Sequence, residues 1–337
     1  MVKFSNAFIE REVFKMLGVR DNSVTLGPGI GEDAAVIRIN NSYMAVHTDP
    51  VTGSSNLLGW LAVHVAANDI ATRGIRPRWF LVTLILPVDY GENDVVNIMR
   101  QINDALIEIN ASLVGGHTEK SDAVTRPIAV TTAIGIGSRF IRTGGLRTGD
   151  VIVMTKYAAL EATAVLVSDF RGRLMNVLSE GEFKEATSLY RMVSVVNDAL
   201  AAAEYATSMH DPTEGGVLQG LLEMAYSSGK LIIINEDNIP VLPVTRRVLN
   251  AFNLNPLTVL SSGSLLIGVG ENDAAKLIGK LRDMGINASI IGKVTDGEPG
   301  VVVKGRSGEQ FFRGDLTIPD GVIEMWLSGN TSEGSKA

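Results

Sequence analysis

Leu26-Gly-Pro-Gly-Ile-Gly-Glu-Asp-Ala-Ala-Val-Ile-Arg-Ile39 runs from a glycine-rich loop into a strand with alternating side chains. Glycines let backbone N–H groups approach a phosphate, and the Asp33 carboxylate beside them could hold its magnesium ion. A dinucleotide fingerprint or a P-loop needs a helix directly after the glycines, and a P-loop also needs a lysine. Both motifs are excluded here. These residues alone leave two interpretations open, a phosphate loop and an ordinary turn before a strand.

Other segments place polar side chains at strand ends or inside an apolar helix. They are the strand end His47-Thr48-Asp49-Pro50, the pair Asn68-Asp69 in a helix expected over 55–72, the run Gly115-Gly116-His117-Thr118-Glu119, and the run from His210 to Gly216 that opens a helix expected from Pro212. This stock of carboxylates and glycines is typical of sites for hard divalent cations and phosphates.

Each segment also has a structural interpretation. Thr48-Asp49-Pro50 is a common turn. Asp69 follows Leu61 and Val65 on the apolar stripe of its helix, where a carboxylate is costly unless it is paired or metal-bound, and this favours a function. Asp211 resembles a helix N-cap, with Pro212 and Glu214 completing a capping box. A metal role for Asp211 does not exclude that capping role.

The composition excludes several classes of protein. The 337 residues carry a net charge of -7, so we expect no nucleic-acid partner, and the absence of cysteine excludes disulfides, thiolate metal sites and thiol nucleophiles. With 45% hydrophobic and 20% charged residues the chain is not disordered. The N-terminus is not a signal peptide, and the longest apolar runs, such as Phe80–Leu86, are strand-sized. We therefore expect a cytoplasmic protein without a membrane partner.

The order of the expected elements predicts two units. The first has a helix over 5–17, and the turn Leu146-Arg-Thr-Gly-Asp150 marks the boundary between the units. The second contains long helices over 182–206 and 271–284, a hairpin near 301–313, and a frayed end from Gly329. Strands come in adjacent groups, which favours an α+β fold over a doubly wound sheet.

Taken in order, these segments resemble the aminoimidazole ribonucleotide (AIR) synthase, or PurM-like, superfamily, which also contains HypE, thiamine-monophosphate kinase and selenophosphate synthetase. Gly31-Glu-Asp-Ala-Ala-Val-Ile37 is similar to the family's Gly-Asp-Asp-Ala-Ala-Val, and Thr48-Asp49 and Asn68-Asp69 also have counterparts there. Met209-His-Asp-Pro-Thr-Glu-Gly-Gly216 looks most like the corresponding run of HypE. The resemblance covers residues 25 to 305.

The resemblance implies a PurM-like two-domain α+β fold. Residues 1–145 would form an ATP-binding α/β domain whose strands build a β-barrel across a homodimer. Residues 146–305 would form an α+β domain, and 306–337 a C-terminal extension. The implied chemistry is phosphoryl transfer from ATP and Mg²⁺, bound between the domains, to an oxygen or selenium nucleophile.

The resemblance also assigns roles to residues. The metal carboxylates would be Asp33, Asp49, Asp69 and Asp211. Groups binding the nucleotide would be Gly31, Glu32, Thr48, Asn68, Gly115, Gly116 and Thr118. His117 or Glu119 would position the nucleophile as the catalytic group.

This chain departs from the family pattern in places. HypE carries its thiocarboxamide on a C-terminal cysteine, whereas this chain ends Gly-Ser-Lys-Ala, so it cannot perform that reaction on itself. His117 stands where relatives have a carboxylate after the paired glycines, which removes a ligand for a second magnesium ion. The run from Thr155 to Glu161 replaces a glycine-rich segment. Arg73, Arg76 and Arg78 would either contact an anionic acceptor or form a solvated basic loop.

Our leading hypothesis is therefore an ATP- and Mg²⁺-dependent, HypE-like enzyme that transfers a phosphoryl group to an oxygen of a small acceptor. One alternative is a binding protein that keeps the nucleotide cleft without turnover, or an accessory protein that presents the cleft to a partner protein of hydrogenase maturation. A second alternative is an activity like that of thiamine-monophosphate kinase.

Overall fold

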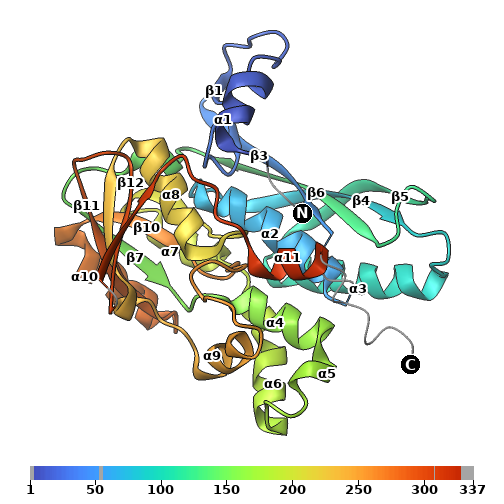
Figure 1. The fold of residues 1–337 in the computed structure, drawn as a ribbon. Helices are drawn as coiled ribbons and strands as arrows, with labels where there is room; N and C mark the ends of the chain where they lie inside the picture. Colours follow the sequence, from blue (N-terminus) through green and yellow to red (C-terminus); the bar gives the residue numbers. More distant parts are fainter. Residues whose placement is uncertain (1–3, 53–55, 307, 328–337) are drawn as a thin grey trace.

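Two β-sheets, each with its own helices, divide the chain into the two expected domains (Figure 1). The computed structural model describes residues 4–52, 56–306 and 308–327. The last strand of the first sheet ends at Gly137 and the first strand of the second begins at Asp150. Neither sheet closes into a barrel within the described part of this chain. The expectation of an α+β chain is confirmed.

The N-terminal sheet has six strands in the order β1-β2-β3-β6-β4-β5. Strands β4 and β5 are parallel, and the other neighbours are antiparallel. Two helices, α2 and α3, cover one face. The bounds are β1 Val24–Leu26, β2 Ala35–Ile39, β3 Ser42–Val51, α2 Leu58–Thr72, β4 Pro77–Leu86, α3 Glu92–Glu108, β5 Ser112–Lys120 and β6 Ile128–Gly137.

Helix α2 is buried along its whole length. Its own side chains are mostly small or apolar on every face, as is typical of a helix enclosed by protein. On one side it packs against buried residues of the sheet such as Ala45, Phe80 and Ala133. On the other side the Trp60 indole donates to the Tyr190 carbonyl, 2.8 Å away in the second domain. Helix α2 therefore lies at the junction between the two domains.

The C-terminal sheet has seven strands in the order β13-β12-β9-β11-β7-β10-β8. Along β7, Ile152 and Met154 face α8 while Val151 and Val153 belong to the core on the other face. The bounds are β7 Asp150–Thr155, α4 Leu160–Asp169, α5 Arg171–Leu174, α6 Glu180–Ser188, α7 Val196–Ala202, β8 Ala206–His210, α8 Gly216–Ser228, β9 Leu231–Asn235, α9 Pro243–Asn250, β10 Leu266–Gly270, α10 Glu271–Asp283, β11 Ala288–Thr295, β12 Gly300–Gly305 and β13 Gly308–Arg313.

The chain then returns toward the first domain. Helix α11, Gly321–Leu327, lies near α2 in Figure 1, and the two helices line one cavity. The Asp320 carboxylate accepts from the backbone N–H groups of Val322 and of Gly215, so it caps α11 and ties it to the start of α8. Strand β13 pairs with β12, so residues 308–313 of the expected extension belong to the second sheet. The expected frayed end from Gly329 lies outside the described residues.

Several expected helices were wrong in extent. The helix over 5–17 is only α1, Asn6–Phe8, followed by a π-helical turn over Ile9–Val13. The single helix over 182–206 is instead α6, a 3₁₀ turn, α7 and the start of β8. The break has a tertiary cause, because the Asn68 side chain binds the carbonyl of Val193 and the N–H of Val195. A continuous helix would have used those two groups internally.

No helix among residues 4–52, 56–306 and 308–327 is long and apolar enough to cross a membrane.

Candidate functional site

A cavity of about 260 Å³ lies between the two domains. The first domain contributes the loop before β2, the end of β3 and one side of α2. The second domain contributes α4, the loop between β8 and α8, and α11. Its acidic lining residues are Glu32, Asp33, Asp49, Asp69, Glu161, Asp211, Glu214 and Glu223.

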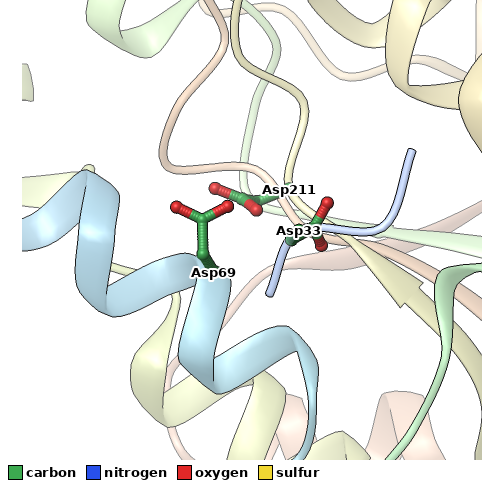
Figure 2. A group of neighbouring side chains, drawn as sticks. All are labelled: Asp33, Asp69 and Asp211. Carbon is green, nitrogen blue, oxygen red and sulfur yellow. The ribbon is translucent and has the colours of Figure 1, made fainter. Parts of the chain in front are cut away.

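Three of these carboxylates converge at one point of the cavity. One oxygen each of Asp33, Asp69 and Asp211 lies within 4.8 Å of the others, and all three residues are buried. Figure 2 shows them approaching from α2 and from two separate loops. These distances suit three carboxylates that share one divalent cation.

Glycines explain how these loops reach the same point. Gly31 has φ +76°, and a Cβ there would lie 2.7 Å from Ser227 Oγ on α8. Gly215 and Gly216 also have positive φ, and a Cβ on Gly216 would lie 2.6 Å from the Val259 carbonyl oxygen. The two glycines turn the chain from β8 into α8, so this helix begins at Gly216 and not at Pro212. The expected capping box at Asp211 is therefore wrong.

The Asp211 carboxylate gives the strongest support for a cation-binding site. Both of its oxygens are buried and have no hydrogen-bond partner among the described residues. Burial, together with the nearby Asp33, raises the pKa of Asp211 to about 8. Burial and the charges of Asp211, Asp33 and Asp49 raise the pKa of Asp69 well above its usual value. A divalent cation would satisfy these oxygens and remove the repulsion, so the residues fit a bound metal.

Asp33 stays ionised because it has cationic neighbours. His210 Nδ1 lies 2.5 Å from Asp33 Oδ1, and Arg73 donates to Asp33 Oδ2 at 3.0 Å. Burial opposes the charge, but His210 and Arg73 outweigh it and lower the pKa of Asp33. His210 also contacts Glu223, and despite burial these two carboxylates raise the pKa of His210 well above its usual value. His210 therefore carries a proton within the acidic site.

Both expectations for Arg73, a contact with an anionic acceptor and a place in a solvated basic loop, are wrong. Its side chain is fully buried, and it pairs with Glu32 and Asp33 and donates to Thr143 Oγ1. The Glu32 carboxylate in turn accepts from the backbone N–H groups of Thr143 and Gly144. Glu32 and Arg73 thus join the glycine loop to the chain entering the second domain. The Glu32 carboxylate lines the cavity, and its role toward a nucleotide stays a prediction.

The remaining expected residues of β3 and α2 are in different positions. Asp49 lines the cavity, close enough to Asp69 to raise its pKa. Thr48 is exposed, and its hydroxyl accepts from Thr132. The Asn68 amide is buried and engaged with Val193 and Val195. Asp49 therefore lines the same cavity but is not one of the three carboxylates that can share an ion, whereas Asn68 serves the domain junction.

The expected site residues of the run from Gly115 to Glu119 do not line the cavity within one chain. Gly115, Gly116, His117, Thr118 and Glu119 all lie on β5, an edge strand that is exposed along its length. His117 Nε2 lies 3.1 Å from Glu119 Oε2, and both side chains are exposed. Any role for them at the cavity requires a second chain.

Sequence reasoning missed several residues of the cavity. His47, His210 and Glu223 contact the aspartates or each other, and Glu161 and Trp326 also line the cavity. His47 and His210 stood next to expected ligands, so their position was a usable signal. Glu161, Glu223 and Trp326 had no comparable signal.

Models of one protein family match both domains. Residues 31–137 match the N-terminal domain model of AIR synthase related proteins, and residues 147–304 match the C-terminal domain model. The chain belongs to this family and has its PurM-like two-domain fold.

Its relatives include proteins with different activities. It is 29% identical over 330 residues to the putative hydrogenase expression/formation protein of Methanocaldococcus jannaschii, with 93% of this chain and 95% of that protein covered. It is 27% identical to the thiamine-monophosphate kinase of Pyrococcus abyssi, with 84% and 88% covered. It is also 27% identical to the carbamoyl dehydratase HypE of Cupriavidus necator, with 81% and 74% covered. The names of two of these relatives, a kinase and a dehydratase, are those of enzymes, which supports an enzyme in general.

Solved structures confirm the fold. AaThiL complexed with AMPPCP and TMP has a TM-score of 0.73 at 19% identity, covering 90% of this chain and 95% of that one. HypE in complex with ATP has a TM-score of 0.71 at 21% identity, covering 94% of each chain.

Proposed function

We propose that this protein is an ATP- and Mg²⁺-dependent enzyme that transfers a phosphoryl group to an oxygen of a small acceptor. The observation that carries the proposal is the buried cluster of Asp33, Asp69 and Asp211, in which both oxygens of Asp211 lack a partner. These aspartates, with Asp49 beside them, would hold Mg²⁺. The bound ion would neutralise triphosphate charge and orient the γ-phosphoryl group.

The charge of the cavity supports the need for a metal. Its described lining includes no lysine and no arginine. Arg73 lies behind the wall and is already paired with carboxylates. A triphosphate would be repelled from such a surface unless cations accompany it. Metal and nucleotide are therefore expected to bind together.

The absence of cysteine favours the alternative of a binding or accessory protein. HypE is a carbamoyl dehydratase among the relatives, yet this chain has no cysteine to carry a group for dehydration. A cysteine-free relative could bind nucleotide without turnover, or serve a partner protein, as a solved HypE-HypF complex shows for HypE. Thiamine-monophosphate kinase activity is the remaining candidate, supported by the Pyrococcus relative.

A homodimer would connect β5 to the site. The face of the first sheet opposite α2 includes the partly exposed Leu81, Thr132, Ile134 and Ile136, and no described element covers it. His117 pairs in register with Thr83 on the same sheet. We propose that two chains cover these faces together, which would form the expected barrel and bring His117 and Glu119 toward the partner's cavity.

The test is Asp211→Asn, which keeps the shape of the side chain and removes its charge. We expect the affinity for ATP in the presence of Mg²⁺, measured by calorimetry, to fall by about 100-fold or more, and Asp49→Asn to act in the same direction. Asp104→Asn, an exposed change on α3, is the matched control and should leave the affinity unchanged.

An Asp211→Asn variant that binds nucleotide normally would contradict the metal assignment. Incubation with ATP, Mg²⁺ and a panel of acceptors, thiamine monophosphate included, then separates the alternatives. Release of ADP above background with one acceptor supports the enzyme, whereas tight binding without turnover across the panel supports the binding protein.

A further inference from the structure

A second polar group lies in the same cavity, away from the aspartate cluster. Glu161 is in the first turn of α4, and Ser262 is in the loop before β10. Both line the cavity, with exposures of only 8% and 1%. Neither belongs to the group of carboxylates that can share an ion.

Glu161 Oε2 and Ser262 Oγ are both buried, and neither makes a hydrogen bond of good geometry with the described residues. The two residues are close enough for Ser262 to lower the pKa of Glu161 through hydrogen bonding, so the carboxylate and the hydroxyl are only weakly satisfied by each other. Buried polar atoms in folded proteins nearly always have a partner, because an unsatisfied one costs about 1–3 kcal/mol. Because both atoms border a cavity, a ligand can supply the missing hydrogen bonds.

The surroundings define what that ligand must carry. Burial raises the pKa of Glu161 to about 7; hydrogen bonding from Ser262 opposes this shift, and Glu214 and Asp320 add to it. The nearby wall is apolar, formed by residues such as Val165 and Leu260. An anionic group here would meet carboxylates and no described lysine or arginine, whereas an N–H or O–H group would find an acceptor.

We propose that Glu161 and Ser262 form the end of the cavity that recognises the acceptor, and that this end takes a neutral or positively charged group bearing N–H or O–H donors. This inference deepens the proposed function, and it rests on that function for the identification of the ligand as the phosphoryl acceptor. Glu161 would be the residue that selects against an anionic group at this end, while the aspartates hold the metal and the triphosphate.

Three probes of the same shape test this preference. Benzamidine carries charged donors, benzamide carries neutral donors, and benzoate carries an anion without donors. We would measure their affinities by ligand-observed NMR on the full chain with Mg²⁺ and AMPPCP. Benzamidine and benzamide should bind at least about tenfold more tightly than benzoate.

Glu161→Gln should weaken benzamidine binding by about tenfold and leave the AMPPCP affinity within about twofold. Ser262→Ala should weaken both donor probes by a smaller factor. Glu185→Gln, an exposed change on α6, is the matched control and should alter no probe.

Equal binding of benzoate and benzamidine to the unaltered protein would overturn the inference. So would a benzamidine affinity that Glu161→Gln and Ser262→Ala both leave unchanged, or the failure of all three probes to bind. If AMPPCP does not bind but the preference for benzamidine depends on Glu161, the proposed function fails and the donor-recognising site stands.

Discussion

The pKa values of the cavity's buried carboxylates are shifted in opposite directions by their individual neighbours. Asp33 has His210 and Arg73 beside it, and its pKa is lowered in spite of burial. Asp69 and Asp211 face other carboxylates instead, and burial and this repulsion raise their pKa values. A single added cation would mainly lower the pKa values of Asp69 and Asp211. The same short side chain thus has different properties at each position because its surroundings differ.

His64 allows a test of burial at a position outside the cavity lining. Its side chain is fully buried against Trp60, and burial, with the charge of Lys156 adding to it, lowers the pKa of His64 to about 3. Glu108, whose own pKa is raised by burial, is the facing carboxylate at 3.7 Å. Below the ordinary histidine pKa, His64 binds a proton in the unfolded chain but stays neutral in the folded chain. Stability therefore falls as the pH decreases from about 6.5 toward 3.

We predict that His64→Phe reduces this loss. Between pH 7 and pH 5 the free energy of unfolding of the unaltered protein should fall by about 2 kcal/mol more than that of the variant, as measured by urea denaturation. Met175→Phe, a change at a position that is 65% exposed, should keep the original pH dependence. Parallel pH profiles for the His64 variant and the unaltered protein would show that His64 is not buried as a neutral ring.

At the scale of elements, the positions where helices begin and end determine the site. The paired glycines delay α8 to Gly216 and leave Asp211 on a loop with free carboxylate oxygens. Asn68 interrupts the long helix expected over 182–206 by binding its backbone. In both cases a local helical pattern is overridden by contacts with distant parts of the chain.

Gly216→Ala should therefore destabilise the protein strongly. Its φ of +65° disfavours alanine, and the added Cβ would meet the carbonyl oxygens of Val259 at 2.6 Å and Leu257 at 2.7 Å. We expect a loss of about 3 kcal/mol or more in the free energy of unfolding, measured by urea denaturation. Gly229→Ala, which has φ +62° in open space, is the control and should cost about 1 kcal/mol. Similar losses for both variants would mean that the contact with Val259 has no effect.

At the scale of the whole molecule, the cavity depends on contacts between domains. Arg73 joins the loop before β2 to Thr143, and Trp60 and Asn68 join α2 to the segment before α7. Helix α11 completes one wall with Ile323 and Trp326. The first sheet, in contrast, leaves its second face uncovered in one chain, which is the basis of the proposed homodimer.

Leu81→Glu tests this assembly. Leu81 is 37% exposed on the uncovered face, where a charge would oppose association. Light scattering after size exclusion should give about twice the chain mass of 36.0 kDa for the unaltered protein and the single-chain mass for the variant. Val88→Glu, in the exposed turn after β4, should leave the dimer intact. A single-chain mass for the unaltered protein would contradict the homodimer.

Local sequence patterns were enough to predict the class of fold and most strands, because alternating side chains, glycine turns and strand-end polar residues depend on interactions between near neighbours. The sequence also identified Asp33, Asp49, Asp69 and Asp211 through ordered motifs. Their metal role is still a prediction, but their common location is now a structural observation.

Which of these residues meet depends on the folded domains together. The burial of Arg73, the raised pKa of His210 and the cavity position of Glu161 all arise from packing between segments far apart in the chain. Such contacts leave no periodic or local pattern, because their energy comes from removing groups from water at a junction that exists only after both domains have folded. For the same reason, β5 carries family-like residues whose surroundings a single chain leaves open.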